Sequence, residues 1–114
     1  MKNSLNSVIL GGTVTTVAKA DDQISFYLSL IRYYRAGEEV LREESVITTV
    51  AYGKLAEVNR ERLEVGKEIR GVGRLRSVQY VSSPYPMIEL VAEHIEVKPD
   101  GKEEEDAEDT EEET

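Results

Sequence analysis

Tyrosine and arginine are the side chains in this sequence best suited to binding another molecule. The chain has six tyrosines, one phenylalanine and no tryptophan. A tyrosine ring can stack on a flat partner while its hydroxyl stays in water. An arginine can bond a phosphate through two N–H groups and can also stack on a ring. These residue types therefore predict a surface for a partner that carries both flat rings and negative charge.

The spacing of these residues follows the alternation of strands. One group shares parity along a single stretch: Arg70, Arg74, Arg76 and Tyr80. In a regular strand these side chains face the same side. Arg32 and Tyr34 share parity as well, and Arg35 follows them. The competing interpretation is a solvated outer face with surface ion pairs, and for Tyr27 we favour a half-buried structural position.

Catalytic and metal chemistry has little support in the sequence. There is no cysteine, which removes disulfides, thiol nucleophiles and thiolate metal sites. The single histidine, His94, lies between Glu93 and Glu96 in an alternating segment and is expected to be a strand residue. No phosphate-cradling GxxxxGK[ST] motif or GxSxG elbow occurs. We therefore expect no enzyme, no cofactor and no metal.

The negative charge of the chain is concentrated at its end. The whole chain has a net charge of −9, and residues 100–114 hold ten acidic residues and one lysine. Residues 1–99 hold 13 basic and 13 acidic residues and sum to zero. The tail has no apolar residue larger than alanine, so it is expected to be disordered. We expect a folded domain at 1–99 and, at 100–114, a tail that is solubilising or serves as an interaction arm.

The apolar segments are too short for a membrane span. The longest apolar runs cover only a few residues. The first ten residues alternate like a strand and lack the basic start and long apolar block of a signal peptide. We expect a cytoplasmic location.

Periodicity divides residues 1–99 into five strands and one helix. The expected strands are 8–17, 24–31, 45–52, 67–78 and 87–97. Gly11-Gly12 predicts a bend or bulge in the first strand, and 36–44 is expected to be a loop. A short helix between the third and fourth strands is expected to end at Gly66. Three strands, a helix and two strands are the plan of a five-stranded OB-fold barrel.

Several segments of this chain resemble the bacterial single-stranded DNA-binding protein family. They are LNSVILGGTV, ISFYLSL, VAYGKLAE, GVGRLRS and MIELVAEHIEV, in matching order along residues 5–97. The acidic tail is also similar to that family's layout. The resemblance implies an OB-fold, a homo-oligomer (a tetramer, or else a dimer), and binding of single-stranded DNA in replication, recombination and repair.

The resemblance also implies which residues bind the strand. The family's aromatic before the long hairpin loop falls on Tyr34, with Tyr33 equally close, and two further aromatics fall on Tyr52 and Tyr80. The lysine that opens the helix falls on Lys54, where a cation is otherwise unfavourable. The arginines expected beside the strand are Arg32, Arg35, Arg74 and Arg76.

Departures from the family pattern keep other functions open. Val46 stands where some members carry an aromatic, and 36–44 holds four acidic residues and one basic residue. The tail lacks the apolar tip that docks partner proteins, so recruitment of replication or repair proteins through it is doubtful. The alternatives are an OB-fold protein-interaction or accessory module with weak or lost DNA binding, and a sugar- or RNA-binding barrel. Exposed edges of an open barrel favour self-association.

Overall fold

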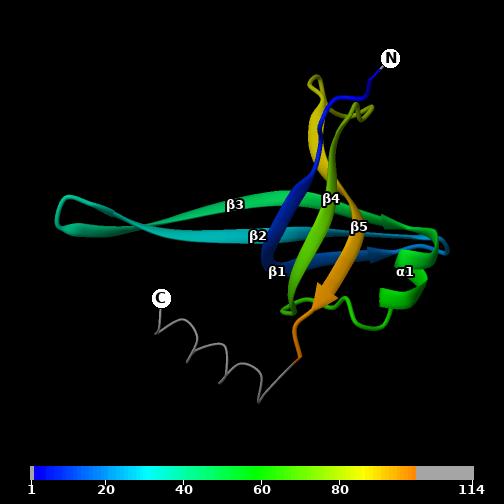
Figure 1. The fold of residues 1–114 in the computed structure, drawn as a ribbon, viewed down its shortest axis with the longest axis horizontal. Helices are drawn as coiled ribbons and strands as arrows, with labels where there is room; N and C mark the ends of the chain where they lie inside the picture. Colours follow the sequence, from blue (N-terminus) through cyan, green and yellow to red (C-terminus); the bar gives the residue numbers. More distant parts are fainter. Residues whose placement is uncertain (1, 100–114) are drawn as a thin grey trace.

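The computed structural model describes residues 2–99, and the expected disordered acidic tail at 100–114 lies outside them. The strands are β1 (Val8–Lys19), β2 (Gln23–Ala36), β3 (Glu39–Tyr52), β4 (Glu68–Val78) and β5 (Met87–Val97), with α1 (Gly53–Asn59) between β3 and β4. They close into a barrel in the order β1-β2-β3-β5-β4 (Figure 1). The predicted OB-fold plan is confirmed.

Two glycines allow the strands to cross closely enough to close the barrel. A Cβ at Gly73 would lie 2.0 Å from the carbonyl oxygen of Val91, and a Cβ at Gly12 would lie 2.3 Å from that of Ser29. No side chain fits at either distance. The register of β1 shifts at Thr15, so the irregularity expected at Gly11-Gly12 occurs a few residues later.

The core is formed by the inward-facing residues of the strands and closed at one end by the helical segment. Ile24, Phe26 and Leu28 alternate along β2 and are fully or almost fully buried. Ala56 in α1 and Leu63 after it are fully buried in the same cluster. The alternation from Ile24 to Leu28 therefore fixes which side of this part of β2 faces outward.

The segment expected to be a loop at 36–44 is instead the end of a long hairpin. Strands β2 and β3 stay paired from Gln23↔Tyr52 to Ala36↔Glu39, so only Gly37 and Glu38 form the turn. Gly37 has φ +66°, which suits a two-residue hairpin turn that begins with glycine. Backbone pairing overrides the charged, loop-like composition. We call residues 30–45 the arm, and Figure 1 shows it extending away from the barrel.

The helix is shorter than predicted. It ends at Asn59, whose side-chain amide donates to the carbonyl of Leu55 at 3.0 Å. Gly66, the predicted end of the helix, lies in a later turn, and its N–H donates to the carbonyl of Val14 at 2.8 Å. The glycine therefore attaches this turn to β1.

Candidate functional site

A hollow of about 750 Å³ lies on the outer face of the barrel, between β2, β3 and the segment that joins β4 to β5. Its walls include alternating positions on two strands, such as Ser25 and Tyr27 on β2 and Val50 and Tyr52 on β3. We call this hollow the groove. Its aromatic and charged lining residues are Phe26, Tyr27, Tyr52, Tyr80, Arg76 and Glu89.

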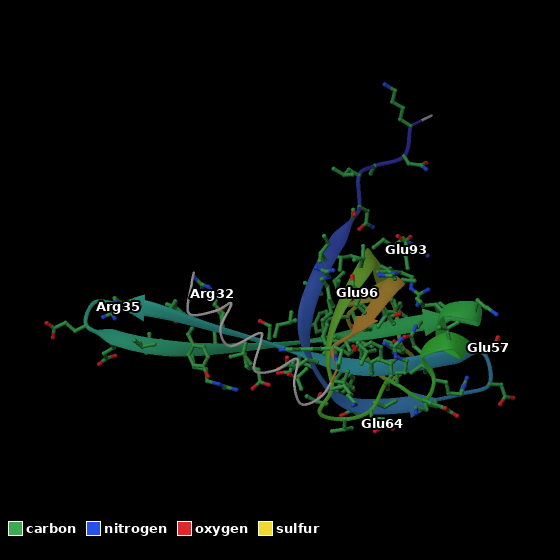
Figure 2. The ribbon with its side chains drawn as sticks, turned by 60° about the horizontal axis from the view of Figure 1, so that its bottom comes forward. Arg32, Arg35, Glu57, Glu64, Glu93 and Glu96 are labelled. Carbon is green, nitrogen blue, oxygen red and sulfur yellow. The ribbon has the colours of Figure 1, made fainter. Side chains whose placement is uncertain are left out.

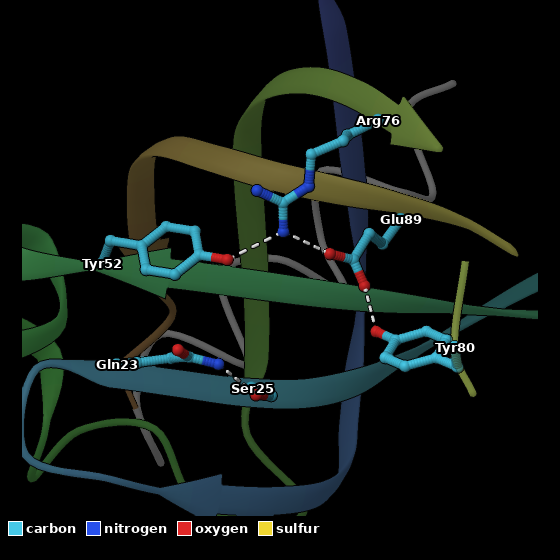
Figure 3. A network of polar contacts seen from close by, with 6 residues as sticks. All are labelled: Gln23, Ser25, Tyr52, Arg76, Tyr80 and Glu89. Carbon is cyan, nitrogen blue, oxygen red and sulfur yellow. Dashed lines mark hydrogen bonds and ion pairs between the residues drawn. The ribbon is translucent and has the colours of Figure 1, made fainter. Parts of the chain in front are cut away.

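Four of these residues form a polar network (Figure 3). Arg76 Nη2 donates to the Tyr52 hydroxyl at 2.7 Å and to Glu89 Oε1 at 2.5 Å. The Tyr80 hydroxyl donates to Glu89 Oε2 at 2.8 Å. The β4–β5 register places Arg76 directly opposite Glu89, and Tyr80 follows the end of β4. The strand pairing therefore fixes the geometry of this site.

The network also shifts the pKa values of Arg76 and Tyr80. The hydrogen bond to Glu89, followed by that to Tyr52, raises the pKa of Arg76 further above its ordinary value. The hydrogen bond that Tyr80 donates to Glu89, followed by partial desolvation, raises the pKa of the Tyr80 hydroxyl. The arginine therefore remains charged and the tyrosine remains protonated at neutral pH.

The tyrosines of the groove keep part of their surface available. Tyr27, Tyr52 and Tyr80 are 47%, 42% and 44% exposed, although the hydroxyls of Tyr52 and Tyr80 are hydrogen-bonded. The guanidinium of Arg76 lies 5.5 Å from the centroid of the Tyr52 ring. The groove thus presents partly exposed tyrosine rings, and hydrogen bonds to the hydroxyls hold the rings of Tyr52 and Tyr80 in place.

The arm holds a second group of predicted residues. The Arg32 guanidinium lies 4.8 Å from the centroid of the Tyr34 ring and 3.6 Å from Glu43 Oε1. Arg35 is exposed near the turn, and Figure 2 shows Arg32 and Arg35 along the arm, away from the barrel. Tyr33 faces the opposite side and lines a separate hollow. The structure therefore does not bring these residues together with Tyr52 and Tyr80.

Two further predicted cations, besides those of the arm, lie outside the groove. Lys54 is exposed in the first turn of α1, and Arg74 pairs with Glu93 at 3.4 Å on the barrel surface. Arg70 and Arg76 share parity as expected, but Arg70 lines the second hollow and Arg76 lines the groove. The register of β4 against β5 shifts between Val72 and Gly73, which lie between these two arginines.

Sequence reasoning missed two residues of the groove. Glu89 was not singled out, although a lone carboxylate among apolar residues in MIELVA is an unusual pattern. Tyr27 is about half exposed, which agrees with the half-buried position expected for it, but its place in the lining of the groove was not predicted. Its alternation with the buried Phe26 and Leu28 was the signal that could have placed it on the outer face.

Within residues 2–99, no group of three or more acidic, histidine or cysteine side chains is arranged to hold a metal ion. His94 Nε2 lies 3.6 Å from Glu96 Oε1 on the surface. Within the same residues, no helix has the length and apolar character of a membrane span.

Comparisons with known proteins identify the fold. No family model and no curated protein sequence matches this chain. An SSB from Plasmodium falciparum in complex with ssDNA has TM-score 0.70 at 18% identity, covering 85% of this chain and 97% of that one. A small single-stranded DNA-binding protein from Streptomyces coelicolor has TM-score 0.70 at 21% identity, covering 85% and 95%. PriB from Ralstonia solanacearum has TM-score 0.62 at 17% identity, covering 84% and 100%.

A deletion mutant of the single-stranded DNA binding protein from Thermus aquaticus also has TM-score 0.70, at 21% identity. This chain is similar to about half of it, covering 52% of that chain. At these identities the likeness defines the fold, which is the OB-fold found in SSB proteins.

Proposed function

We propose that this chain binds single-stranded DNA without sequence preference. The observation that carries the proposal is the groove, which three partly exposed tyrosines and one arginine line together. In OB-folds, the face of the second and third strands and the loops beside it bind oligonucleotides. Every base has a flat face, so stacking on these rings needs no particular sequence.

The proposed mechanism divides the work between rings and cations. Bases stack on Tyr52 and Tyr80, and each such stack contributes about 1–3 kcal/mol. The backbone contacts exposed cations outside the groove, namely Arg32, Arg35, Lys54 and Arg74. Stacking on Tyr34, or on Tyr33, extends the path along the arm. The neutral charge of residues 1–99 predicts a modest dependence on salt.

The cellular setting is part of the proposal. A protein that coats single strands acts where they are exposed, in replication, recombination and repair. We place it in the cytoplasm, associated with the nucleoid.

We also propose that the chain assembles with copies of itself, as a tetramer or a dimer. The barrel is closed, so the free strand edges lie on the arm, where β2 and β3 pair only with each other. A lone two-stranded hairpin is marginally stable in water. One face of the arm and its base exposes Ile31, Tyr33, Val40 and Val46. Light scattering should give a multiple of the 12.8 kDa chain mass, and a monomer mass would contradict this.

The second candidate function is an accessory module that binds proteins more strongly than DNA. The zero net charge of residues 1–99 favours it, as do the acidic residues of the arm. This candidate predicts little retention of single strands even at low salt.

Fluorescence anisotropy with labelled oligo-dT, at about 20 and 200 mM salt, tests the proposal on the full chain. Binding at the lower salt that weakens moderately at the higher salt is expected. An oligo-rU of the same length reports on the 2′-hydroxyl, and a duplex of the same length serves as the control. Absence of oligo-dT binding at low salt would favour the accessory module, and a strong preference for oligo-rU would indicate an RNA-binding barrel.

A further inference from the structure

The groove contains a buried carboxylate, which is unexpected on a surface proposed to bind a polyanion. The side chain of Glu89 is only 2% exposed. Both of its oxygens are used, because Oε1 accepts from Arg76 and Oε2 accepts from Tyr80. A buried charge is tolerated when it is paired and hydrogen-bonded in this way. Glu89 therefore belongs to the built structure of the groove.

This carboxylate cancels the positive charge of the groove. Within residues 2–99, Arg76 is the one lysine or arginine that lines the groove, and Glu89 is the one acid. The two stand opposite each other in the β4–β5 ladder. A phosphate that approached Arg76 would also meet the negative charge of Glu89, which opposes the attraction of the guanidinium for it. The groove thus attracts phosphate poorly.

The other ion pairs of the surface differ from this one. Arg32 and Glu43 are 66% and 53% exposed, so water can solvate both when a ligand separates them. Glu89 has no comparable access to water. Separating Arg76 from Glu89 would leave a buried charge unpaired, which is costly. Arg32 is therefore available to a phosphate, whereas Arg76 is held in place.

We propose that the groove is a subsite for the bases and excludes the phosphate backbone, with Glu89 as the residue that determines this. Glu89 neutralises Arg76 and positions the ring of Tyr80, while Arg76 holds the hydroxyl of Tyr52. The partly exposed faces of these rings remain for stacking. This inference rests on the proposed binding of single strands and specifies which part of the strand enters the groove.

The variant Glu89→Gln tests the proposal by removing charge while keeping shape. The amide oxygen of glutamine can still accept from Arg76, and its NH₂ group can donate to the Tyr80 hydroxyl. Arg76 then becomes an unneutralised cation facing the ligand. We expect tighter binding of labelled oligo-dT, and a plot of log affinity against log salt that is steeper by about 0.7, as for one added phosphate contact.

Glu96→Gln is the matched control. Glu96 is on the same strand and pairs with Arg70 directly across the same ladder, but it lies outside the groove and is exposed. Both variants change the net charge equally. We expect the slope with Glu96→Gln to change much less than with Glu89→Gln. Equal steepening in both variants would mean that overall charge is responsible, and would overturn the proposal.

The double variant Arg76→Gln/Glu89→Gln gives an independent measurement. It removes the pair without leaving a buried charge behind, and thermal unfolding verifies that it folds. We expect the double variant to have the same slope of log affinity against log salt as the wild type, because Arg76 contacts no phosphate in the wild type. A slope shallower by about 0.7 would place a phosphate on Arg76 and overturn the proposal.

The outcomes also separate this inference from the proposed function. A wild-type chain that binds oligo-dT, with an unchanged slope in Glu89→Gln, would overturn the base subsite alone. A wild-type chain that does not bind at about 20 mM salt would overturn both.

Discussion

The groove and the arm contain the same chemical pair in two environments. Arg76 lies 5.5 Å from the ring centroid of Tyr52 in the groove, and Arg32 lies 4.8 Å from that of Tyr34 on the arm. Each arginine also meets a glutamate. The partner in the groove is 2% exposed, whereas the partner on the arm is 53% exposed.

This difference in burial decides what each arginine can do. A surface ion pair contributes about 0–1 kcal/mol and opens readily for a ligand. A buried carboxylate resists losing its partner, so the arginine beside it acts as part of the scaffold. The same arginine–tyrosine contact therefore orients rings in the groove and offers an available cation on the arm.

The barrel and the arm should differ most in their tolerance of an added methyl group. Gly73→Ala places a Cβ against the backbone oxygen of Val91, and we expect it to destabilise the barrel by about 4 kcal/mol or more, or to prevent folding. Gly37→Ala meets no neighbouring atom but must adopt positive φ, which costs about 1–2 kcal/mol. Urea unfolding followed by circular dichroism measures both. Similar losses would contradict a barrel closed by glycine contact.

Strand binding should depend more on the rings of the groove than on those of the arm. Tyr52→Ala removes a stacking surface and is expected to weaken oligo-dT binding by about 1–3 kcal/mol, or roughly 5- to 150-fold. Tyr34→Ala should cost less, because Tyr34 is less exposed than Tyr52. Arg32 also lies closer to the ring of Tyr34 than Arg76 lies to that of Tyr52.

The matched control for this comparison is Tyr85→Ala. Tyr85 is 73% exposed in the segment before β5 and does not line the groove. The affinity of the Tyr85→Ala variant for oligo-dT should stay within about twofold of the wild-type affinity. A larger loss from Tyr34→Ala than from Tyr52→Ala would move the main contact to the arm.

The two glutamates should differ in their effect on stability. Glu89→Ala leaves Arg76 and Tyr80 without their acceptor, and we expect a loss of about 1–3 kcal/mol. Glu43→Ala removes an exposed pair and should cost less than about 1 kcal/mol. Thermal unfolding of both variants at neutral pH gives the comparison. Equal losses would show that burial does not distinguish the pairs.

The smallest expected effect is a pH dependence of folding stability that comes from Glu96, which lies outside the groove. The hydrogen bond from Arg70 lowers the pKa of Glu96 below its ordinary value of 4.5. The unfolded chain then binds this proton more readily, so the contribution of the pair is present above about pH 4.5 and is lost as pH falls through the lower folded value. As the pH falls from 6 to 3, thermal unfolding should show a slightly smaller loss of stability in Glu96→Gln than in the wild type. An identical dependence of thermal stability on pH in the two proteins would show that the Arg70–Glu96 pair makes no such contribution.

Much of the fold follows from the sequence alone. Alternation in ISFYLSL determines which residues of β2 are buried, because a strand presents successive side chains to opposite faces. The segment predicted as the last strand, 87–97, agrees with β5. The arm was not predicted, because charged residues are typical of loops and only pairing across the hairpin extends the strands to Gly37.

The candidate site depended more on tertiary structure. Tyr52, Tyr80 and Arg76 were selected from the sequence, and the barrel brings them together, although their binding role stays a prediction. Glu89 is far from Tyr52 in the sequence, and only the register of β4 with β5 places it against Arg76. The sequence determined which residue types were available and which face of each strand they occupy, since both are local properties of the chain. Barrel closure alone decided which cation is neutralised and which is free, because that depends on contacts and burial between distant strands.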